Sequence, residues 1–453
     1  MLRKELFIRR DTMKKNNIKK LISFALIIAM LFSLNTFIAF AGEASDIEWY
    51  NFRNNPENNG IVSSQTPISG ATANLKWAEK YGTGWAAAPT PPLILDGYLY
   101  IGMSNKIVKI DKDTGEKVAE SDAMVGNVGY AMNPITYADG KLFVQVGSGI
   151  IQAVDYETLK CVWSTEKIGG QTLCPISYVK IDGKGYIYTG TWQSEVKDGA
   201  YMCFSTDDSN VNENKIKKAE WRFIPSGQTD QLLSANIVYE DTKLTCDEDL
   251  KAAISDESSV SRRGFYWAGA YACEKYIAVG TDDGTREGDY KANACFYTLD
   301  PVTGEVIDKI SGIKGDIRTT VVYNEGNLYF GTKGGLVYKV AVDSDGKLSE
   351  VKNIDLGNMV TASPLVYNGK IYIGVCSPQG QFAAEGHKFA VISTEKMELL
   401  YDLPIKGYPQ AAALLSTAYE NEDFDGDGKA DGRVYIYFTY NNNPGGICYT
   451  YDA

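Results

Sequence analysis

Apolar and polar residues alternate with a period of two along short segments, and Gly-containing turns separate these segments over most of the chain. Such a period is typical of β-strands, whose successive side chains point to opposite faces of a sheet. One phrase recurs: a tight turn, usually Asp-Gly or Asn-Gly, followed by a strand rich in Tyr and Ile. Asx-Gly is the pair that a type I′ hairpin turn requires, because both central residues need positive φ. The seven copies, of which the fourth is degraded, begin at residues 96, 139, 182, 274, 325, 368 and 431.

Each copy is preceded by an apolar strand of small residues and followed by further strands, often joined by a Thr-Gly turn such as Thr114-Gly115 or Thr303-Gly304. Small residues suit the innermost strand of a propeller, where the blades converge and space is least. A repeat of roughly 40–50 residues built from strands alone is typical of a β-propeller blade. Four strands in each of seven units predict an all-β, seven-bladed β-propeller.

The repeat consists of an Asp-Gly turn, a strand of the form hydrophobic-Tyr-hydrophobic-Gly, a strand ending in Asp, and a Thr-Gly turn. This pattern resembles the repeat of PQQ-like (quinoprotein dehydrogenase-like) propellers, and the resemblance covers residues 74–453. It implies the fold. It implies less about function, because this repeat serves redox enzymes and purely binding proteins alike.

The last repeat has one strand fewer than the others, because the chain ends after the strand at residues 447–451. Residues 74–80, Asn-Leu-Lys-Trp-Ala-Glu-Lys, resemble a fourth strand and precede the first repeat. We therefore expect residues 75–80 to pair with residues 447–451 and to complete the last blade. Such pairing would close the ring and remove exposed sheet edges. Residues 42–73 are then expected to form an N-terminal clamp segment laid on the ring.

The first 41 residues have the features of a secretory signal peptide: four lysines between residues 14 and 20, an apolar stretch over residues 21–40, and the small-x-small sequence Ala39-Phe40-Ala41. Either Met1 or Met13 can be the start, and retention of the segment as an anchor is the alternative to cleavage. The whole chain has a net charge of −12, and the part after residue 41 has −18. This acidic balance argues against nucleic acid or an anionic membrane surface as a partner. We expect a monomer that is secreted to the extracellular side, with the cell surface possible and no membrane span after cleavage.

None of the eight cysteines forms a C-x-x-C motif or an adjacent pair. Cys203, Cys295 and Cys448 occupy matching places on the third strands of three different repeats. Equivalent positions on separate blades indicate buried thiols that pack between sheets rather than a disulfide. Mostly free thiols in a secreted protein would suit a reducing habitat.

The connections differ in length between the two faces of the expected propeller. Turns after first and third strands are tight with one exception, whereas the other face carries the remaining long connections, including the insertion at residues 227–263. Long loops on a rigid scaffold are usually functional, so we expect this face to bind a ligand. The connections from fourth to first strands on that face carry Gly followed by aromatic or polar residues. The candidate ligand-binding residues on them are Trp85, Tyr130, Gln171, Tyr266, Trp267, Arg318, Tyr408 and Gln410.

Two interpretations of these residues stay open. They can form a binding mouth that stacks a flat or sugar-like ligand or grips an extended peptide. Alternatively, the aromatic residues only cap the central channel.

Residues 423–432 read Asp-Phe-Asp-Gly-Asp-Gly-Lys-Ala-Asp-Gly, which places carboxylates at relative positions 1, 3, 5 and 9 and Gly at position 6. This spacing matches a calcium-binding loop. The expected ligands are the side chains of Asp423, Asp425, Asp427 and Asp431 and the backbone carbonyl of Lys429. Position 12 is Val434 rather than the Glu of an EF-hand, and the loop runs into a strand, so it resembles the calcium hairpin of integrin-type FG-GAP repeats. It lies on the tight-turn face, opposite the long loops, and we therefore expect calcium to have a structural role.

Little in the sequence indicates catalysis. His387, the only histidine, lies in a Gly-rich insertion and is expected to be a solvated loop residue; Asp316 is a further candidate base. The sequence contains no nucleophile elbow, H-E-x-x-H motif, P-loop or Rossmann fingerprint. The resemblance to quinoprotein dehydrogenases would imply an adjacent Cys-Cys pair beside the cofactor and a longer, eight-bladed chain. Both are missing, so pyrroloquinoline quinone (PQQ) is not expected as a cofactor.

The sequence therefore favours a secreted, calcium-stabilised propeller that acts as a non-catalytic binding or scaffold module. Its expected ligand is an extracellular protein or a cell-wall polysaccharide bound on the long-loop face. The first alternative is a quinone-dependent redox enzyme similar to the dehydrogenases. The second is a sugar-active enzyme that uses paired carboxylates in the mouth.

Overall fold

Two compact units make up the chain, residues 1–47 and residues 48–453, and the part that can be described lies in the second. The predicted signal peptide and its cleavage site lie outside it. Among the described residues, no helix is long and apolar enough to cross a membrane. The computed structural model describes residues 48–81, 88–128, 134–147, 149–166, 174–192, 199–227, 242–253, 263–267, 269–284, 290–442 and 445–452.

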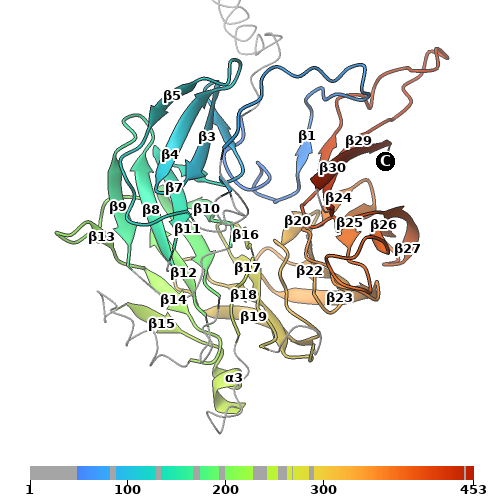
Figure 1. Cartoon of the computed structure of the whole chain (residues 1–453). Coiled ribbons are helices and arrows are strands. Elements are labelled where there is room, and N and C mark those ends of the chain that lie inside the picture. Colours follow the sequence, from blue (N-terminus) through green and yellow to red (C-terminus); the bar gives the residue numbers. More distant parts are fainter. Residues whose placement is uncertain are drawn as a thin grey trace, which may run out of the picture. The chain divides into compact units, whose positions relative to one another are not determined.

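The described strands form seven sheets of four or five strands that follow one another in sequence order (Figure 1). Neighbouring core strands are antiparallel in every sheet. The predicted seven-bladed β-propeller is therefore confirmed. Blades one to three comprise β2 (Leu93–Leu95), β3 (Tyr98–Met103), β4 (Lys106–Asp111) and β5 (Lys117–Glu120); β6 (Thr136–Ala138), β7 (Lys141–Val146), β8 (Ile150–Asp155) and β9 (Cys161–Thr165); and β10 (Ser177–Ile181), β11 (Lys184–Gly190), β12 (Tyr201–Ser205) and β14 (Trp221–Phe223).

The remaining blades repeat this arrangement, with the first strand of each blade on the inner side of its sheet. Blades four to six comprise β16 (Tyr271–Ala272), β17 (Ile277–Gly280), β18 (Ala294–Leu299) and β19 (Val306–Ile313); β20 (Val322–Asn324), β21 (Asn327–Gly331), β22 (Leu336–Val342) and β23 (Leu348–Asp355); and β24 (Leu365–Tyr367), β25 (Lys370–Val375), β26 (His387–Ser393) and β27 (Leu399–Ile405). Blade seven comprises β28 (Leu414–Ser416), β29 (Tyr435–Asn442) and β30 (Gly445–Asp452).

The turns between first and second strands have the predicted geometry. Asp96 has a φ of 48° and Gly97 a φ of 79°, and four further turns also have positive φ at both central positions, at residues 139–140, 182–183, 325–326 and 368–369. These values are those of type I′ turns, whose twist matches that of the flanking strands.

Hydrophobic clusters join neighbouring blades. The cluster between blades three and four includes Trp221, Phe223 and Tyr297, which are fully buried. Cys203 and Cys295 lie in the same cluster as buried free thiols, as the sequence predicts, and all seven cysteines in the described part of the chain are free. The side chain of Cys448 lies outside the described residues.

Two blades carry a fifth, parallel strand on their outer edge. β13 (Ile216–Lys217) pairs with β9, and β15 (Lys243–Thr245) pairs with β14. The latter belongs to the insertion at residues 227–263, whose described part also contains the helix α3 (Glu248–Ala253). Asp247 accepts hydrogen bonds from the Tyr297 hydroxyl (2.9 Å) and the Lys309 Nζ (2.6 Å). This part of the insertion is therefore attached to blade four and is not a free loop.

The N-terminal strand that joins the last blade is not the predicted one. β1 (Ile61–Val62) pairs in parallel with β28, on the inner edge of the sheet ordered β1-β28-β29-β30. Residues 74–81 form no strand, and in the described part of the chain β30 pairs with β29 alone. The predicted pairing of residues 75–80 with residues 447–451 is thus wrong, because an earlier segment supplies the strand and does so at the opposite edge.

Residues 74–80 nevertheless resemble a fourth strand in one respect. The side chain of Trp77 makes the contacts that a tryptophan on a fourth strand makes with the next blade. The Trp77 indole covers Gly115 and donates from Nε1 to the Lys112 carbonyl at 2.9 Å. Trp221, on the fourth strand of blade three, covers Gly304 of the next blade in the same way and donates to the Pro301 carbonyl at 3.1 Å. Residues 74–80 therefore cover blade one as a preceding blade would, without strand pairing.

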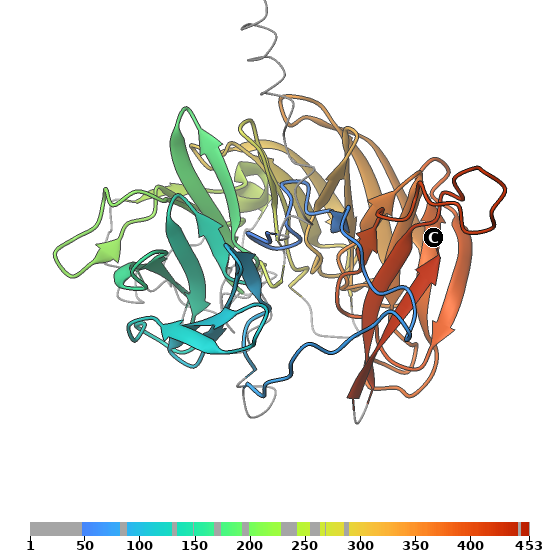
Figure 2. The same ribbon diagram turned by 90° about the horizontal axis from the view of Figure 1, so that it is seen from above.

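Residues 48–62 lie among the inner strands, where Figure 2 shows this blue segment between the sheets. The predicted clamp segment is thus, in this part, an internal component rather than a layer on the ring. Its partners belong to six different blades: Ile94 (with Trp49), Tyr137 (with Tyr50), Ala270 and Val321 (with Asn58), Tyr323 (with Glu57), Val366 (with Asn59), and Pro364 and Ala413 (with Arg53). Burial lowers the pKa of Arg53 to about 9. A buried guanidinium is tolerated here because backbone carbonyls accept its N–H groups.

Candidate ligand-binding site and acidic loop

Three successive blades end their second strand with the same Gly-Thr pair, and the residue that follows it lies at the long-loop face. These positions are Gly190-Thr191-Trp192, Gly280-Thr281-Asp282 and Gly331-Thr332-Lys333. The Thr281 carbonyl accepts a hydrogen bond from the Ile317 N–H at 3.0 Å, which attaches the connection before blade five to the end of this strand.

Gly280 must lack a side chain, because a Cβ there would lie 2.3 Å from Cγ2 of Ile317. The close packing of Ile317 on Gly280 brings the next residue, Arg318, beside Asp282. Phe265 lies over Gly190 in the same way. The residues after Phe265, Tyr266 and Trp267, are thereby held at the same face.

Arg318 forms two ion pairs. Its Nε lies 3.2 Å from Oδ1 of Asp282, and its Nη2 lies 2.8 Å from Oδ2 of Asp316. Asp316 also accepts the Asp283 N–H at 3.0 Å and lies 3.9 Å from Nζ of Lys333. The two carboxylates are only 1% and 4% exposed.

The charges of this group influence one another. Burial raises the pKa of Asp282 to about 8, which the neighbouring Asp316 reinforces and Arg318 opposes. Burial disfavours the charge on Arg318, but Asp282 and Asp316 outweigh it, so that the pKa of the guanidinium rises. The guanidinium therefore stays charged, while Asp282 can hold a proton near neutral pH.

Aromatic rings cover the Arg318 guanidinium. Tyr266 and Trp267 stack with ring centres 4.8 Å apart, and Trp192 lies 5.1 Å from Tyr266. The Arg318 guanidinium carbon lies 4.5 Å from the centre of the Tyr266 ring, within the range of a cation–π contact. Trp267 has a φ of 61°, a left-handed conformation that is strained for an aromatic residue and that tends to occur at functional sites.

We call the six residues Trp192, Tyr266, Trp267, Asp282, Asp316 and Arg318 the aromatic–arginine cluster. All three aromatic residues are partly exposed. Three buried polar atoms of the cluster have no hydrogen-bond partner in the described part of the chain: Oδ2 of Asp282, Nε1 of Trp192 and Nε1 of Trp267. Because a buried polar atom without a partner costs about 1–3 kcal/mol, three in one group indicate a place where polar atoms of a ligand can bind.

The structure brings together three of the predicted ligand-binding residues, Tyr266, Trp267 and Arg318. Tyr408 is fully buried, its hydroxyl bonds to Thr361 and its ring stacks on His387. Gln410 accepts a hydrogen bond from Asn441 at 3.3 Å. The other predicted residues, Trp85, Tyr130 and Gln171, lie outside the described residues.

The prediction of a solvated His387 is wrong. This residue begins β26 and is 1% exposed. Its Nδ1 accepts the Ser377 N–H and its Nε2 lies 2.9 Å from the Ala383 carbonyl. Both ring nitrogens therefore hold the preceding loop in place, which the sequence could not indicate because the Gly-rich segment before it resembles a free loop.

Trp192, Asp282 and Lys333 were not predicted as site residues. The signal that could have identified them is the recurrence of Gly-Thr at the end of the second strand in three adjacent blades. Positions that follow the same pair in a repeat protein lie at equivalent places on one face.

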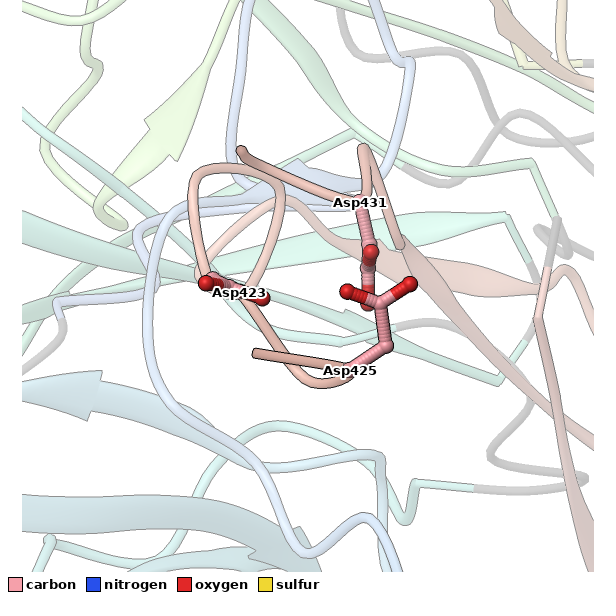
Figure 3. A group of neighbouring side chains, drawn as sticks. All are labelled: Asp423, Asp425 and Asp431. Carbon is pink, nitrogen blue, oxygen red and sulfur yellow. The ribbon is translucent and has the colours of Figure 1, made fainter. Parts of the chain in front are cut away.

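The acidic loop of residues 423–432 lies between β28 and β29. Figure 3 shows the carboxylates of Asp425 and Asp431 facing each other, with Asp423 on the neighbouring turn. One carboxylate oxygen from each of these three residues lies within 4.8 Å of the others, and all three side chains are exposed. Asp427 is not part of this group; its Oδ1 accepts the Lys429 N–H at 2.8 Å.

Backbone hydrogen bonds organise the loop around Asp423. Its carboxylate accepts the N–H groups of Gly428 (2.8 Å) and Gly426 (2.6 Å), and these bonds lower the pKa of Asp423. Both glycines have positive φ, which the sharp turns require. Asp431 is 3.2 Å from Arg433. Three of the four predicted carboxylates thus lie together as oxygen donors that suit a hard divalent cation.

A comparison with protein-family models also finds a similarity to PQQ-like proteins in the first part of the chain. Residues 55–199 match a family model described as outer membrane protein assembly factor BamB. No curated protein sequence matches the chain.

Solved structures with a similar fold have low sequence identity to this chain. They include quinohemoprotein alcohol dehydrogenase from Comamonas testosteroni, with 14% identity, a TM-score of 0.49, and coverage of 92% of this chain and 82% of that chain. A europium-containing methanol dehydrogenase has 12% identity and a TM-score of 0.40, with 88% and 90% covered. The computationally designed protein Ika8 has 11% identity and a TM-score of 0.37, with 82% and 98% covered. Residues 55–199 are thus similar to a family of PQQ-like propeller proteins, and the seven sheets show that the described chain folds as a seven-bladed β-propeller.

Proposed function

We propose that this protein is a secreted, non-catalytic binding or scaffold module that holds its ligand at the aromatic–arginine cluster. The ligand is an extracellular protein or a cell-wall polysaccharide. The observation that carries the proposal is the combination of partly exposed, stacked aromatic rings with three buried polar atoms that have no partner in the described part of the chain. Aromatic faces and a few unsatisfied polar atoms are the usual components of a binding site.

The same contacts speak against catalysis by paired carboxylates. Asp282 and Asp316 both bind the Arg318 guanidinium and are almost fully buried. A general base has to reach a substrate proton or a water molecule, and Asp316 is already occupied by Arg318 and the Asp283 N–H. A sugar-active enzyme is therefore less well supported than a binding module.

The test combines binding with turnover. The protein without residues 1–41 is screened against cell-wall glycans and secreted proteins, and the ligand found is then incubated with it for a day. We expect saturable binding, loss of binding in Trp267→Ala, and a ligand that is unchanged by mass spectrometry. Release of a shortened or oxidised product would contradict the proposal and favour an enzyme.

A quinone-dependent redox enzyme is the second candidate, since the stacked pair Tyr266–Trp267 beside Arg318 offers a flat surface next to a cation. The residues present do not fit PQQ well. This cofactor carries three carboxylates, whereas the Arg318 nitrogens are already in contact with Asp282 and Asp316. The acidic loop follows a first strand and so lies on the face opposite the cluster.

We expect that incubation with PQQ and calcium produces neither saturable binding nor dye reduction with alcohols or aldose sugars. Micromolar uptake of PQQ that disappears in Trp267→Ala would contradict this expectation and favour the enzyme.

We also propose that the acidic loop binds a structural calcium ion through Asp423, Asp425 and Asp431. Support comes from their spacing in the sequence and from the short distances among their carboxylates. The bound ion would stabilise the connection between β28 and β29 without contact with the ligand face.

A further inference from the structure

We infer that the aromatic–arginine cluster selects an uncharged, polyhydroxylated ligand, that is, a neutral saccharide, over a carboxylated or phosphorylated one. This inference rests on the proposed binding function and names its ligand class. It follows from the charges, the unpaired atoms and the rings of the cluster.

Carboxyl oxygens already occupy the Arg318 nitrogens that an anion would contact. Arg318 has carboxylate oxygens at 3.2 Å and 2.8 Å on two of its nitrogens, and the second carboxylate also faces Lys333. An anionic ligand would have to displace Asp282 or Asp316 from Arg318 and leave a buried carboxylate without its partner. Breaking a buried ion pair in this way is strongly unfavourable.

The unpaired atoms require a ligand that can both donate and accept. The two indole Nε1–H groups, of Trp192 and Trp267, can only donate, and they need an acceptor. Oδ2 of Asp282 accepts when the carboxyl group is ionised and can donate when it holds a proton, so it needs a partner that can do either. A hydroxyl group fulfils all these roles, whereas a carboxylate or phosphate oxygen only accepts and is repelled by Asp282 whenever that carboxyl group is ionised.

The aromatic rings supply the remaining part of the site. Tyr266 and Trp267 form one stacked pair, with Trp192 against it at 5.1 Å. Aromatic faces have a negative quadrupole that attracts the slightly positive C–H groups of a sugar ring. A saccharide presents such a C–H face and hydroxyl groups on the same ring, and the cluster places ring faces and unpaired polar atoms side by side.

The experiment begins with an array of neutral oligosaccharides, their uronic acid counterparts and extended peptides. The neutral oligosaccharide that binds most tightly is then compared by calorimetry with its C6-oxidised form, which has the same stereochemistry and added carboxylates. We expect the oxidised form to bind at least about tenfold more weakly, because it must disturb a buried ion pair. The dissociation constant of the neutral ligand should not change between low and high salt.

Two variants test the role of the unpaired donors. Trp192→Phe and Trp267→Phe keep an aromatic ring but remove the Nε1–H, and each is expected to weaken binding about tenfold. Trp77→Phe is the matched control, because its Nε1 donates to the Lys112 carbonyl at the rim of blade one. This control should lower the melting temperature slightly and leave the affinity unchanged.

The outcomes separate the inference from the function on which it rests. Tighter binding of the oxidised form, binding of peptides alone, or equal affinity of the three Trp variants would overturn the inference and leave a binding module in place. No binding to any probe, glycan or protein, would overturn the proposed function as well.

Discussion

At the scale of single residues, Asp282 is a carboxyl group held away from water beside a charged arginine. Its Oδ1 faces Arg318, while its Oδ2 is buried without a partner in the described part of the chain. The contact with Arg318 favours the ionised form of Asp282, and the burial of Oδ2 disfavours it. Burial wins, and the pKa of Asp282 rises from 3.8 to about 8.

This shift predicts a dependence of stability on pH. Since the folded pKa lies above the unfolded one, the stabilisation is complete below about pH 4 and is lost as pH rises through about 8. The Asp282→Asn variant lacks this titration, so its melting temperature relative to the wild type should be higher at pH 9 than at pH 5. The corresponding change in the free energy of unfolding between the two pH values can reach a few kcal/mol, because one pKa unit corresponds to about 1.4 kcal/mol.

The control is Asp345→Asn, which changes an exposed carboxylate in a turn of blade five and is expected to show no difference of this kind between pH 5 and pH 9. If Asp282→Asn also showed no pH dependence relative to the wild type, Asp282 would have to be ionised in the folded protein at all pH values tested. Thermal unfolding followed by circular dichroism measures both variants.

At the scale of elements, tryptophan side chains on outer segments connect each segment to the following blade. Trp221 is fully buried over Gly304, and Trp77 is half-buried over Gly115. The two indoles make the same contacts, although β14 is a strand and residues 74–80 are not. The side chain, rather than backbone pairing, therefore attaches the N-terminal segment to blade one.

We expect Trp221→Ala to reduce the free energy of unfolding by about 3–5 kcal/mol and Trp77→Ala by about 1–2 kcal/mol, in proportion to their burial. Urea unfolding measures both changes. In Trp77→Ala, hydrogen exchange should increase mainly in blade one, because Ile101, Val108 and Ile110 lie in the cluster that Trp77 covers. Exchange that increased only in blade seven would show that residues 74–80 stabilise the last blade instead.

At the scale of the whole propeller, the N-terminal segment connects the blades through contacts with their inner strands. Residues 48–62 contact inner strands of six blades, and β1 extends the last sheet. Arg53 reaches both blade six and blade seven through the Pro364 and Ala413 carbonyls. The acidic loop lies in that last blade, in the connection between β28 and β29, which a bound ion would stabilise.

Calcium is expected to stabilise the folded protein by about 2.7 kcal/mol at a concentration of 100 times Kd, if it binds only the folded state. Chelation should therefore lower the melting temperature of the wild type by a few degrees. Asp425→Asn should be insensitive to chelation, whereas Asp345→Asn, in an exposed turn of blade five, should respond like the wild type. An equal response of all three proteins would eliminate the site.

Much of the fold could be predicted from the sequence, because its signals are local. Alternating strands and Asp-Gly turns specify each hairpin within a few residues, and Asp96-Gly97 adopts the positive φ values that this pair favours. The seven copies of the repeat in the sequence then predicted seven blades. The grouping of Tyr266, Trp267 and Arg318 on one face also followed from their place after fourth strands, and the spacing of the acidic loop was evident in the sequence alone.

Only the tertiary structure decided which distant segments meet. Ile61 pairs with Leu415, and no local pattern marks partners so far apart in a chain. Asp282 became part of the site because Ile317 packs on Gly280 and carries Arg318 to it, a contact between two blades. The sequence by itself determined the repeating blade, since hairpins depend on neighbouring residues; packing between blades decided the path of the N-terminal segment and the composition of the cluster, since both depend on contacts across the ring.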